Sequence, residues 1–277
     1  DVEGAIILMQ AAYQRTPVIE SEDRAWVATH LAHLELARGR HEDADKLAQH
    51  ALELFPGYHY ALAQLTKVRL AQGRVDEAVA LLRKHVAAAP HPENFYALGV
   101  ALHKAGKTRE ARAMLAEFEQ KARAEMNGWD NANRELVMYY VEQARQPSKA
   151  VAVARMEAAR REDVYTLDAL AWALSAAGKH AEARAVMDKA LAVGIREAGM
   201  LYRAGMIAMR QPDARAARDF FRRSLEADPS SEYAQAARRY ALQWREPPGR
   251  TRRAAASAGH CPASRRGSAS WCGPTAR

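Results

Sequence analysis

Six alanines recur along the chain at nearly constant intervals, and this repetition restricts the possible folds more than any other feature. The intervals between successive alanines are 34, 33, 39, 33 and 34 residues. A turn residue stands five positions before each alanine, and in four of the six cases it is glycine. The alanines are Ala44, Ala78, Ala111, Ala150, Ala183 and Ala217, and the turn residues are Gly39, Gly73, Gly106, Arg145, Gly178 and Pro212. A period of this length predicts an array of repeated units rather than a fold built around one centre.

The clearest unit runs from Tyr165 to Leu191 and is predicted to form two helices around Gly178. Before the glycine, apolar residues fall at positions i, i+3, i+4 and i+7, which is one stripe of an α-helix. These residues are Leu167, Leu170, Ala171 and Leu174, and a second stripe follows the glycine. Glycine suits the turn because a chain that reverses into an antiparallel helix commonly needs a positive φ angle there. One such pair cannot bury its own apolar faces, so copies must stack on either side.

Two-helix units with a period of about 34 residues resemble the tetratricopeptide repeat. Prolines at Pro56, Pro90 and Pro229 agree, because each would end a second helix. The resemblance implies an all-α fold, a right-handed α-solenoid with a C-terminal capping helix. The stretches NREL, DVYTLDALAWAL and YRAGMIAM also resemble bacterial tetratricopeptide proteins of undefined function. Many of those proteins are exported, which favours a periplasmic over a cytoplasmic location.

The repeats divide the chain into four parts. We expect a half repeat at 1–19, six repeats from about 25 to 231, a capping helix at about 231–246 and a basic disordered tail at 247–277. The longest interval places a longer loop at 124–130, where Asn127-Gly128 is a turn signal. The half repeat at the start leaves a second interpretation open. In it, the chain is a regulatory or substrate-recruiting fragment of a larger enzyme or secretion assembly.

The formal net charge of +8 raises the question of nucleic-acid binding. Six arginines and no acid lie between Pro247 and Arg277, so the rest of the chain carries only +2. A nearly neutral body lacks the concentrated basic surface that phosphate binding needs. The charge therefore argues against a nucleic-acid partner for the repeats. No apolar run approaches the roughly 20 residues that span a bilayer.

Candidate reactive groups are few, and each has a simpler explanation. The stretch ALHKAGKT at 101–108 ends like a phosphate-binding loop but has alanine where that motif needs its first glycine. His30 and His33 could share a metal ion, but no third ligand stands at a fixed spacing. Cys261 and Cys272 lie in the tail and match no zinc or redox spacing. We predict no catalytic residue, cofactor or metal, and therefore no enzyme.

In tetratricopeptide arrays the first helix of each repeat lines a concave side, where ligands usually bind. Carried over to this chain, that side lies 13, 10, 6 and 3 residues before each turn residue, a stripe distinct from the core stripe. Seven of the fifteen tryptophans and tyrosines fall at those positions. These side chains are common on partly solvated binding surfaces, because each combines an apolar ring with a polar group. The alternative is that some of them pack between neighbouring helices.

The candidate binding residues follow from this stripe and from the charges beside it. They are Trp26, His33, Tyr60, Lys67, Tyr96, His103, Lys104, Tyr139, Glu142, Tyr165, Asp168, Trp172, Tyr202 and Met206. The basic residues of this set lie in the first three repeats, and the acidic residues lie in the fourth and fifth repeats. We therefore predict a non-catalytic scaffold or adaptor that binds a protein or an extended polar peptide. Members of the superfamily that hold chaperone carboxylates use an asparagine at such a slot, and here no equivalent slot holds one, so that specificity is not expected. The oligomeric state is left open.

Overall fold

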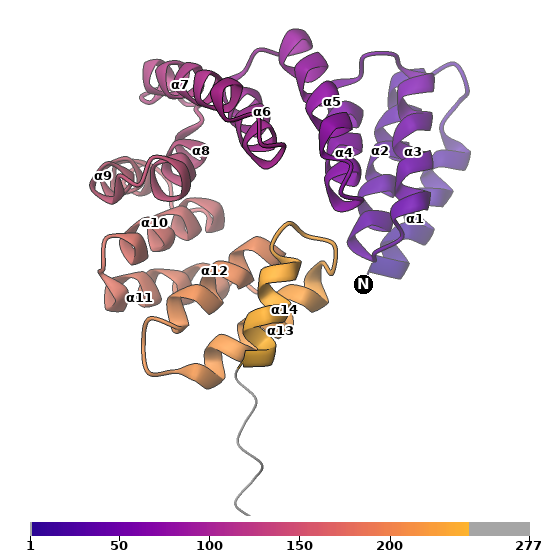
Figure 1. The fold of residues 1–277 in the computed structure, drawn as a ribbon. Helices are drawn as coiled ribbons and strands as arrows, with labels where there is room; N and C mark the ends of the chain where they lie inside the picture. The colour runs from indigo at the N-terminus through magenta and orange to yellow at the C-terminus, as the bar shows by residue number, and fades with distance from the viewer. Residues whose placement is uncertain (1, 244–277) are drawn as a thin grey trace, which may run out of the picture. The chain divides into compact units, whose positions relative to one another are not determined.

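The computed structural model describes residues 2–243, and within that range it contains fourteen α-helices, one π-helix and no β-strand (Figure 1). The α-helices are α1 (Val2–Arg15), α2 (Ser21–Ala37), α3 (His41–Leu54), α4 (His59–Ala71), α5 (Val75–Ala88), α6 (Pro92–Lys104), α7 (Thr108–Glu125), α8 (Asn133–Met138), α9 (Pro147–Ala158), α10 (Val164–Ala176), α11 (His180–Leu191), α12 (Ala198–Ala208), α13 (Ala214–Ala227) and α14 (Ala234–Gln243); the π-helix is η1 (Tyr139–Gln143). The predicted tail at 247–277 and the end of the predicted capping helix lie outside the described residues.

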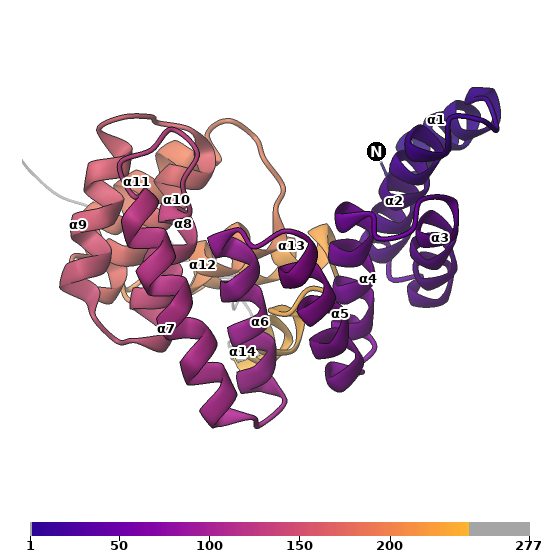
Figure 2. The ribbon, with the colours of Figure 1, turned by 90° about the horizontal axis from the view of Figure 1, so that it is seen from above.

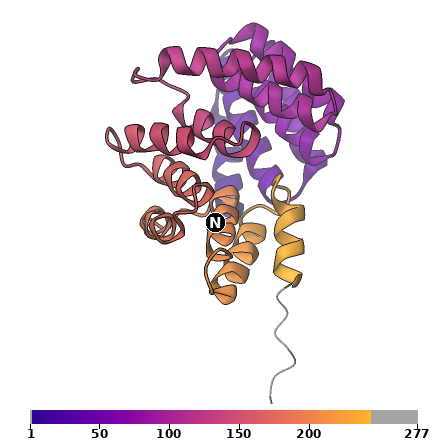
Figure 3. The same ribbon diagram turned by 60° about the vertical axis from the view of Figure 1, so that its left-hand side comes forward.

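Successive helices pair and the pairs stack side by side, as two further views show (Figures 2 and 3). The pairs are α2–α3, α4–α5, α6–α7, α8–α9, α10–α11 and α12–α13, with η1 continuing α8. First helices of neighbouring pairs also touch. Helix α2 packs on α4, and α10 packs on both α8 and α12. The predicted all-α solenoid is confirmed. Helix α1 packs on α2 at one end of the series and α14 packs on α13 at the other.

The six recurring alanines lie in the cores of the helical pairs, where none is more than 1% exposed. In the last pairs, Ala183 and Ala217 share one cluster with Met187, Phe221 and Leu174. Alanine at these positions lets two helices approach closely, and a larger side chain would force them apart. The spacing that revealed the repeats is thus the spacing of close helix contacts.

The turn residues have the backbone geometry that the repeat predicts. Gly178 has a φ of +77°, and Arg145, which holds the same slot in the fourth repeat, has a φ of +55°. A non-glycine residue in this region is strained by about 1–2 kcal/mol, so the fourth turn keeps its conformation at a cost. In the sixth repeat Pro212 cannot adopt a positive φ. There the Asp213 carboxylate instead accepts a hydrogen bond from the Ala216 amide at 3.0 Å and caps α13.

The fourth repeat differs most from the others. Its first helix is short and continues as η1, in which the Ala144 amide donates to the Tyr139 carbonyl at 2.9 Å, five residues back. This wider turn, which inserts one residue into the helix, was not predicted from the sequence. The surplus residues of the longest interval lie close to the expected place, since α7 ends at Glu125 and a loop continues to α8.

The loop between α13 and α14 occupies residues 228–233. Helix α14 begins at Ala234, three residues later than the predicted start at about 231. Within the loop, the Ser230 hydroxyl lies 2.5 Å from Nε2 of His41, at the first turn of α3. The last described helix is therefore preceded by a segment that touches the first full repeat.

Candidate functional site

We call the predicted binding residues, which lie on α2, α4, α6, η1, α10 and α12, the inner face. Its N-terminal half carries two aromatic rings that reach solvent. Trp26 on α2 is 46% exposed and Tyr60 on α4 is 57% exposed. The two residues hold the same slot in adjacent repeats, and each ring lies 3.9 Å from a histidine ring on its own helix, His30 and His59. Tryptophan and tyrosine are enriched at protein interfaces relative to the rest of the protein surface.

Positive charge accompanies these rings. Lys67, His103 and Lys104 are exposed, and within residues 2–243 none of their side chains has an ion-pair or hydrogen-bond partner. Desolvation by surrounding protein atoms, followed by the charge of Lys67, lowers the pKa of His33, which lies on α2. The exposed Glu93 is the acid at the N-terminal slot of α6, where the two preceding repeats have Trp26 and Tyr60. In this half the exposed aromatic side chains are thus limited to the beginnings of α2 and α4, while Lys67, His103 and Lys104 lie further along α4 and α6.

The C-terminal half of the inner face is less open. Tyr96 of α6 is buried, and burial is the main reason why its pKa is raised. The charge of Glu142 comes next, and Tyr233 and Glu232 in the loop before α14 also raise this pKa. The carboxylate of Glu142 accepts a hydrogen bond from Nε1 of Trp172 at 3.1 Å. Burial raises the pKa of Glu142 as well. The rings of Tyr202 and Tyr233 stack with centroids 4.9 Å apart.

Asp168 is not a contact residue, and that part of the prediction is wrong. Its side chain is fully buried and accepts two hydrogen bonds from Arg203 of α12, at 2.8 and 2.5 Å. Sequence reasoning missed Arg203, although a signal existed. An arginine within a stripe of buried residues needs an acid, and Asp168 stands 35 residues earlier, about one repeat away. The pair joins two first helices and leaves no charge for a ligand.

The remaining predicted residues lie in different surroundings. The hydroxyl of Tyr139 donates to Glu119 of α7 at 3.3 Å, so this ring packs against a second helix, as the alternative for these aromatics anticipated. Tyr165 is 44% exposed beneath the Arg134 guanidinium, which lies 5.3 Å from its ring centroid. Trp172 and Met206 line a pocket of about 480 Å³ at the turn ends of the last repeats.

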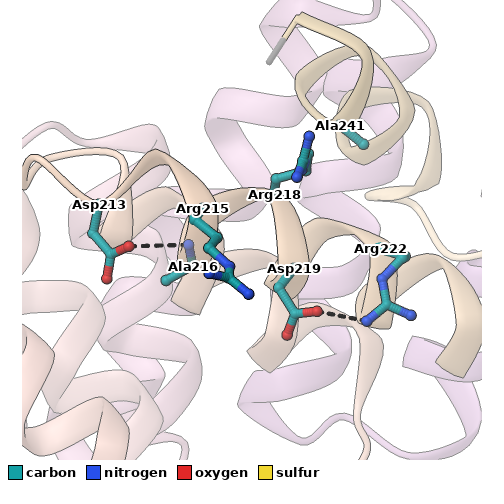
Figure 4. Close-up of a pocket in the computed structure, with 7 residues that line it drawn as sticks. All are labelled: Asp213, Arg215, Ala216, Arg218, Asp219, Arg222 and Ala241. Atoms are coloured by element: carbon teal, nitrogen blue, oxygen red, sulfur yellow. Dashed lines mark hydrogen bonds and ion pairs between the residues drawn. The ribbon is translucent and has the colours of Figure 1, made fainter. Parts of the chain in front are cut away.

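A larger pocket, of about 790 Å³, lies between α13 and α14 and contains none of the predicted binding residues. Figure 4 shows its lining on α13, where Asp213 is bonded to the Ala216 amide and Asp219 to Arg222. Arg222 also binds Glu226 at 2.6 Å, so its charge is compensated within its own helix. Sequence reasoning had not selected this surface. It has the mixed, paired charges of a solvated helix face.

Two further observations bear on the chemistry. Over the described range, no group of three or more histidine, cysteine, aspartate or glutamate side chains is placed to hold a metal ion. No helix between residues 2 and 243 is both long and apolar enough to cross a membrane.

Comparisons with known proteins agree with the repeat pattern. Sequence models of the tetratricopeptide repeat match residues 35–98, 95–117 and 169–232. A tetratricopeptide repeat protein from Parabacteroides merdae superposes with a TM-score of 0.55 at 16% identity, over 87% of this chain and 93% of that one. The Cut9–Hcn1 hetero-tetramer of APC/C gives a TM-score of 0.53 at 13% identity, over 87% of this chain and 46% of that one. A search of curated proteins found no match. At such identities the structural likeness shows the fold alone.

Proposed function

Because the chain is a tetratricopeptide repeat protein, we propose that it is a non-catalytic scaffold whose inner face binds an extended acidic segment of a partner protein. Repeat solenoids commonly serve as protein-interaction scaffolds through their long binding surfaces. The single observation that carries the proposal is the pair Trp26 and Tyr60, exposed at equivalent slots of adjacent repeats. The alternative, a recruiting fragment of a larger enzyme or secretion assembly, stays a prediction.

The two aromatic rings provide the energy of binding in this proposal. A buried tryptophan or tyrosine removes about 150–250 Å² from water, and such residues are often binding hot spots worth about 2 kcal/mol or more. The rings are already held by His30 and His59 at 3.9 Å, so little side-chain entropy remains to be lost on binding.

The cations define the class of partner segment. Lys67, His103 and Lys104 have no acidic partner within the described part of the chain. A peptide that carries aspartate or glutamate between apolar residues would neutralise them, and this complementarity adds specificity and speeds association. An extended peptide suits the face because its contacts repeat from one first helix to the next.

Site-specific photo-cross-linking in the native host tests the proposal. A photoreactive phenylalanine analogue at position 60 should capture a protein through an acidic segment, and the synthetic segment should bind the purified chain. The same analogue in place of Trp129 is the matched control, because this tryptophan is 91% exposed on the α7–α8 loop, outside the inner face.

Affinity measurements with that synthetic segment complete the test. The double variant Trp26→Ala/Tyr60→Ala should weaken binding at least about thirtyfold, a loss of about 2 kcal/mol. Lys67→Glu should also weaken binding, and the affinity of this variant should depend less on salt concentration than the affinity of the wild type. Trp129→Ala should leave the affinity unchanged. Equal capture at positions 60 and 129, or an unchanged affinity in the double variant, would reject the proposal.

A further inference from the structure

Residues 228–233 run from a contact with the first full repeat to the inner face of the sixth repeat, where Tyr233 packs. Tyr233 stacks on Tyr202, with an interplanar angle of 22°. Its hydroxyl accepts a hydrogen bond from Nη1 of the buried Arg203 at 3.3 Å. The tyrosine thus contributes both an apolar face and a polar tip, which is how tyrosine commonly serves at interfaces.

Gly199 provides the space for this ring. A Cβ atom at Gly199 would lie 2.8 Å from Cε2 of Tyr233, which is too close for any side chain to share the site. Gly199 holds the slot that carries Trp26, Tyr60 and Tyr165 in the first, second and fifth repeats. In the sixth repeat this slot therefore has no aromatic side chain of its own, and the ring of Tyr233 fills it from outside the repeat.

The start of the segment reaches the first full repeat. The Ser230 hydroxyl lies 2.5 Å from Nε2 of His41, and Pro229 Cγ lies 3.8 Å from where a Cβ on Gly39 would be. Burial is the largest influence on the carboxyl of Asp228 and raises its pKa, while the neighbouring His33 and His41 act in the opposite direction. The segment therefore places a carboxyl near two histidines and, five residues later, a ring on Tyr202.

We propose that Tyr202 and Arg203 of α12, together with the surface of the first full repeat around His41, form a binding site for a peptide with an acidic residue and an aromatic residue five positions apart, and that residues 228–233 fill this site in the free protein. A partner that carries the same pair binds by displacing the chain's own segment. The segment is present at an effective concentration in the millimolar range because it is tethered, so only a tighter or longer ligand replaces it.

The proposal does not involve Trp26 or Tyr60, although it shares His33 with the open half that contains them. It does not require that half to bind anything, and the two can fail separately. A loss of binding in Trp26→Ala/Tyr60→Ala bears on the open half, whereas the measurements below use Tyr233 and Gly199.

Fluorescence anisotropy with a labelled peptide, EADPSSEYAQA, which copies residues 226–236, tests the proposal. The wild-type chain should bind this peptide at least about tenfold more weakly than Tyr233→Ala, in which the tethered ring no longer competes. Gly199→Ala should not bind it, because the added Cβ occupies the space of the ring. Gln235→Ala, an exposed position on α14, should behave like the wild type.

Two controls make the result decisive. A peptide with alanine in place of its tyrosine should bind Tyr233→Ala at least about tenfold more weakly than the parent peptide. Hydrogen exchange on the wild-type chain needs no variant: excess parent peptide should speed exchange of the amides at 228–233, and the tyrosine-free peptide should not. If Tyr233→Ala binds no better than the wild type, or if exchange at 228–233 is unaffected by the parent peptide, the proposal is wrong.

Discussion

Arg203 and Asp168 form a two-point hydrogen-bonded ion pair, with nitrogen–oxygen distances of 2.8 and 2.5 Å, between neighbouring first helices. Neither residue is more than 2% exposed. Burial by itself lowers the pKa of Arg203, but the charge of Asp168 and the hydrogen bonds to it outweigh burial and raise that pKa. The arginine therefore stays charged at any pH at which the protein is folded.

Removal of one partner from this pair should destabilise the fold strongly. Asp168→Ala leaves the buried guanidinium with only the more distant carboxylate of Glu197, at 3.7 Å, and we expect a loss of about 3–5 kcal/mol. The double variant Asp168→Leu/Arg203→Met should lose much less than the two single variants together, because it buries no charge. Urea unfolding followed by circular dichroism measures each loss. The exposed pair Arg155–Glu182, at 2.9 Å, is the control, and Arg155→Ala should cost under about 1 kcal/mol. Equal losses in Asp168→Ala and Arg155→Ala would contradict the prediction.

The ionised form of Glu142 should oppose folding at neutral pH. Its folded pKa lies above the unfolded value, chiefly through burial, so the stability it contributes is present below the unfolded pKa and is lost as pH rises through the folded pKa. Glu142→Gln, which keeps an acceptor for Trp172, should therefore melt at a higher temperature than the wild type at pH 7. The difference should shrink towards pH 4. Thermal melts across that range measure it.

Glu182 provides a control of opposite sign for the pH series. A hydrogen bond from Lys179 is the largest influence on this exposed carboxylate and lowers its pKa, so its contribution is present above the unfolded pKa. Glu182→Gln should melt slightly lower than the wild type at pH 7 and converge with it in acid. A Glu142→Gln curve that ran parallel to the wild-type curve at every pH would argue against the assigned cause.

The turn slot of the fourth repeat should prefer glycine. Arg145 has a φ of +55° there, and Arg145→Gly should relieve strain and stabilise the chain by about 1 kcal/mol. The reciprocal change, Gly178→Ala at a φ of +77°, should destabilise by a similar amount. Denaturant midpoints compare the two directly. If both variants shift the midpoint in the same direction, the slots are not equivalent.

The repeat spacing predicted the parts of the fold that depend on neighbouring residues. Ala44, Ala183 and the other recurring alanines are buried as expected, and the slot at Arg145 keeps its turn even without glycine. Local periodicity specifies such contacts because each repeat packs mainly on the next. The wider turn of η1 was not predicted, because one inserted residue leaves the apolar pattern of that helix nearly unchanged.

The candidate site was less predictable, because its surroundings depend on residues far apart in the sequence. The inner stripe placed Trp26 and Tyr60 on an exposed surface, but it could not show that Tyr233 covers Tyr202. Gly199, alone among the N-terminal slots in being glycine, was the available sign of a ring from elsewhere. Asp168 was wrongly predicted to lie on the binding surface because its partner Arg203 was not recognised. A carboxylate with no known partner is ordinarily expected to be exposed to solvent.

The contact between His41 and Ser230 joins residues 189 positions apart. A linear array of repeats ordinarily frays from its ends, because each terminal unit is held by one neighbour only. Here the first full repeat and the segment after the last one hold each other. Opening either end must also break this contact, which couples the unfolding of distant repeats. On heating, the first full repeat and the segment at 228–233 should therefore open together rather than one after the other.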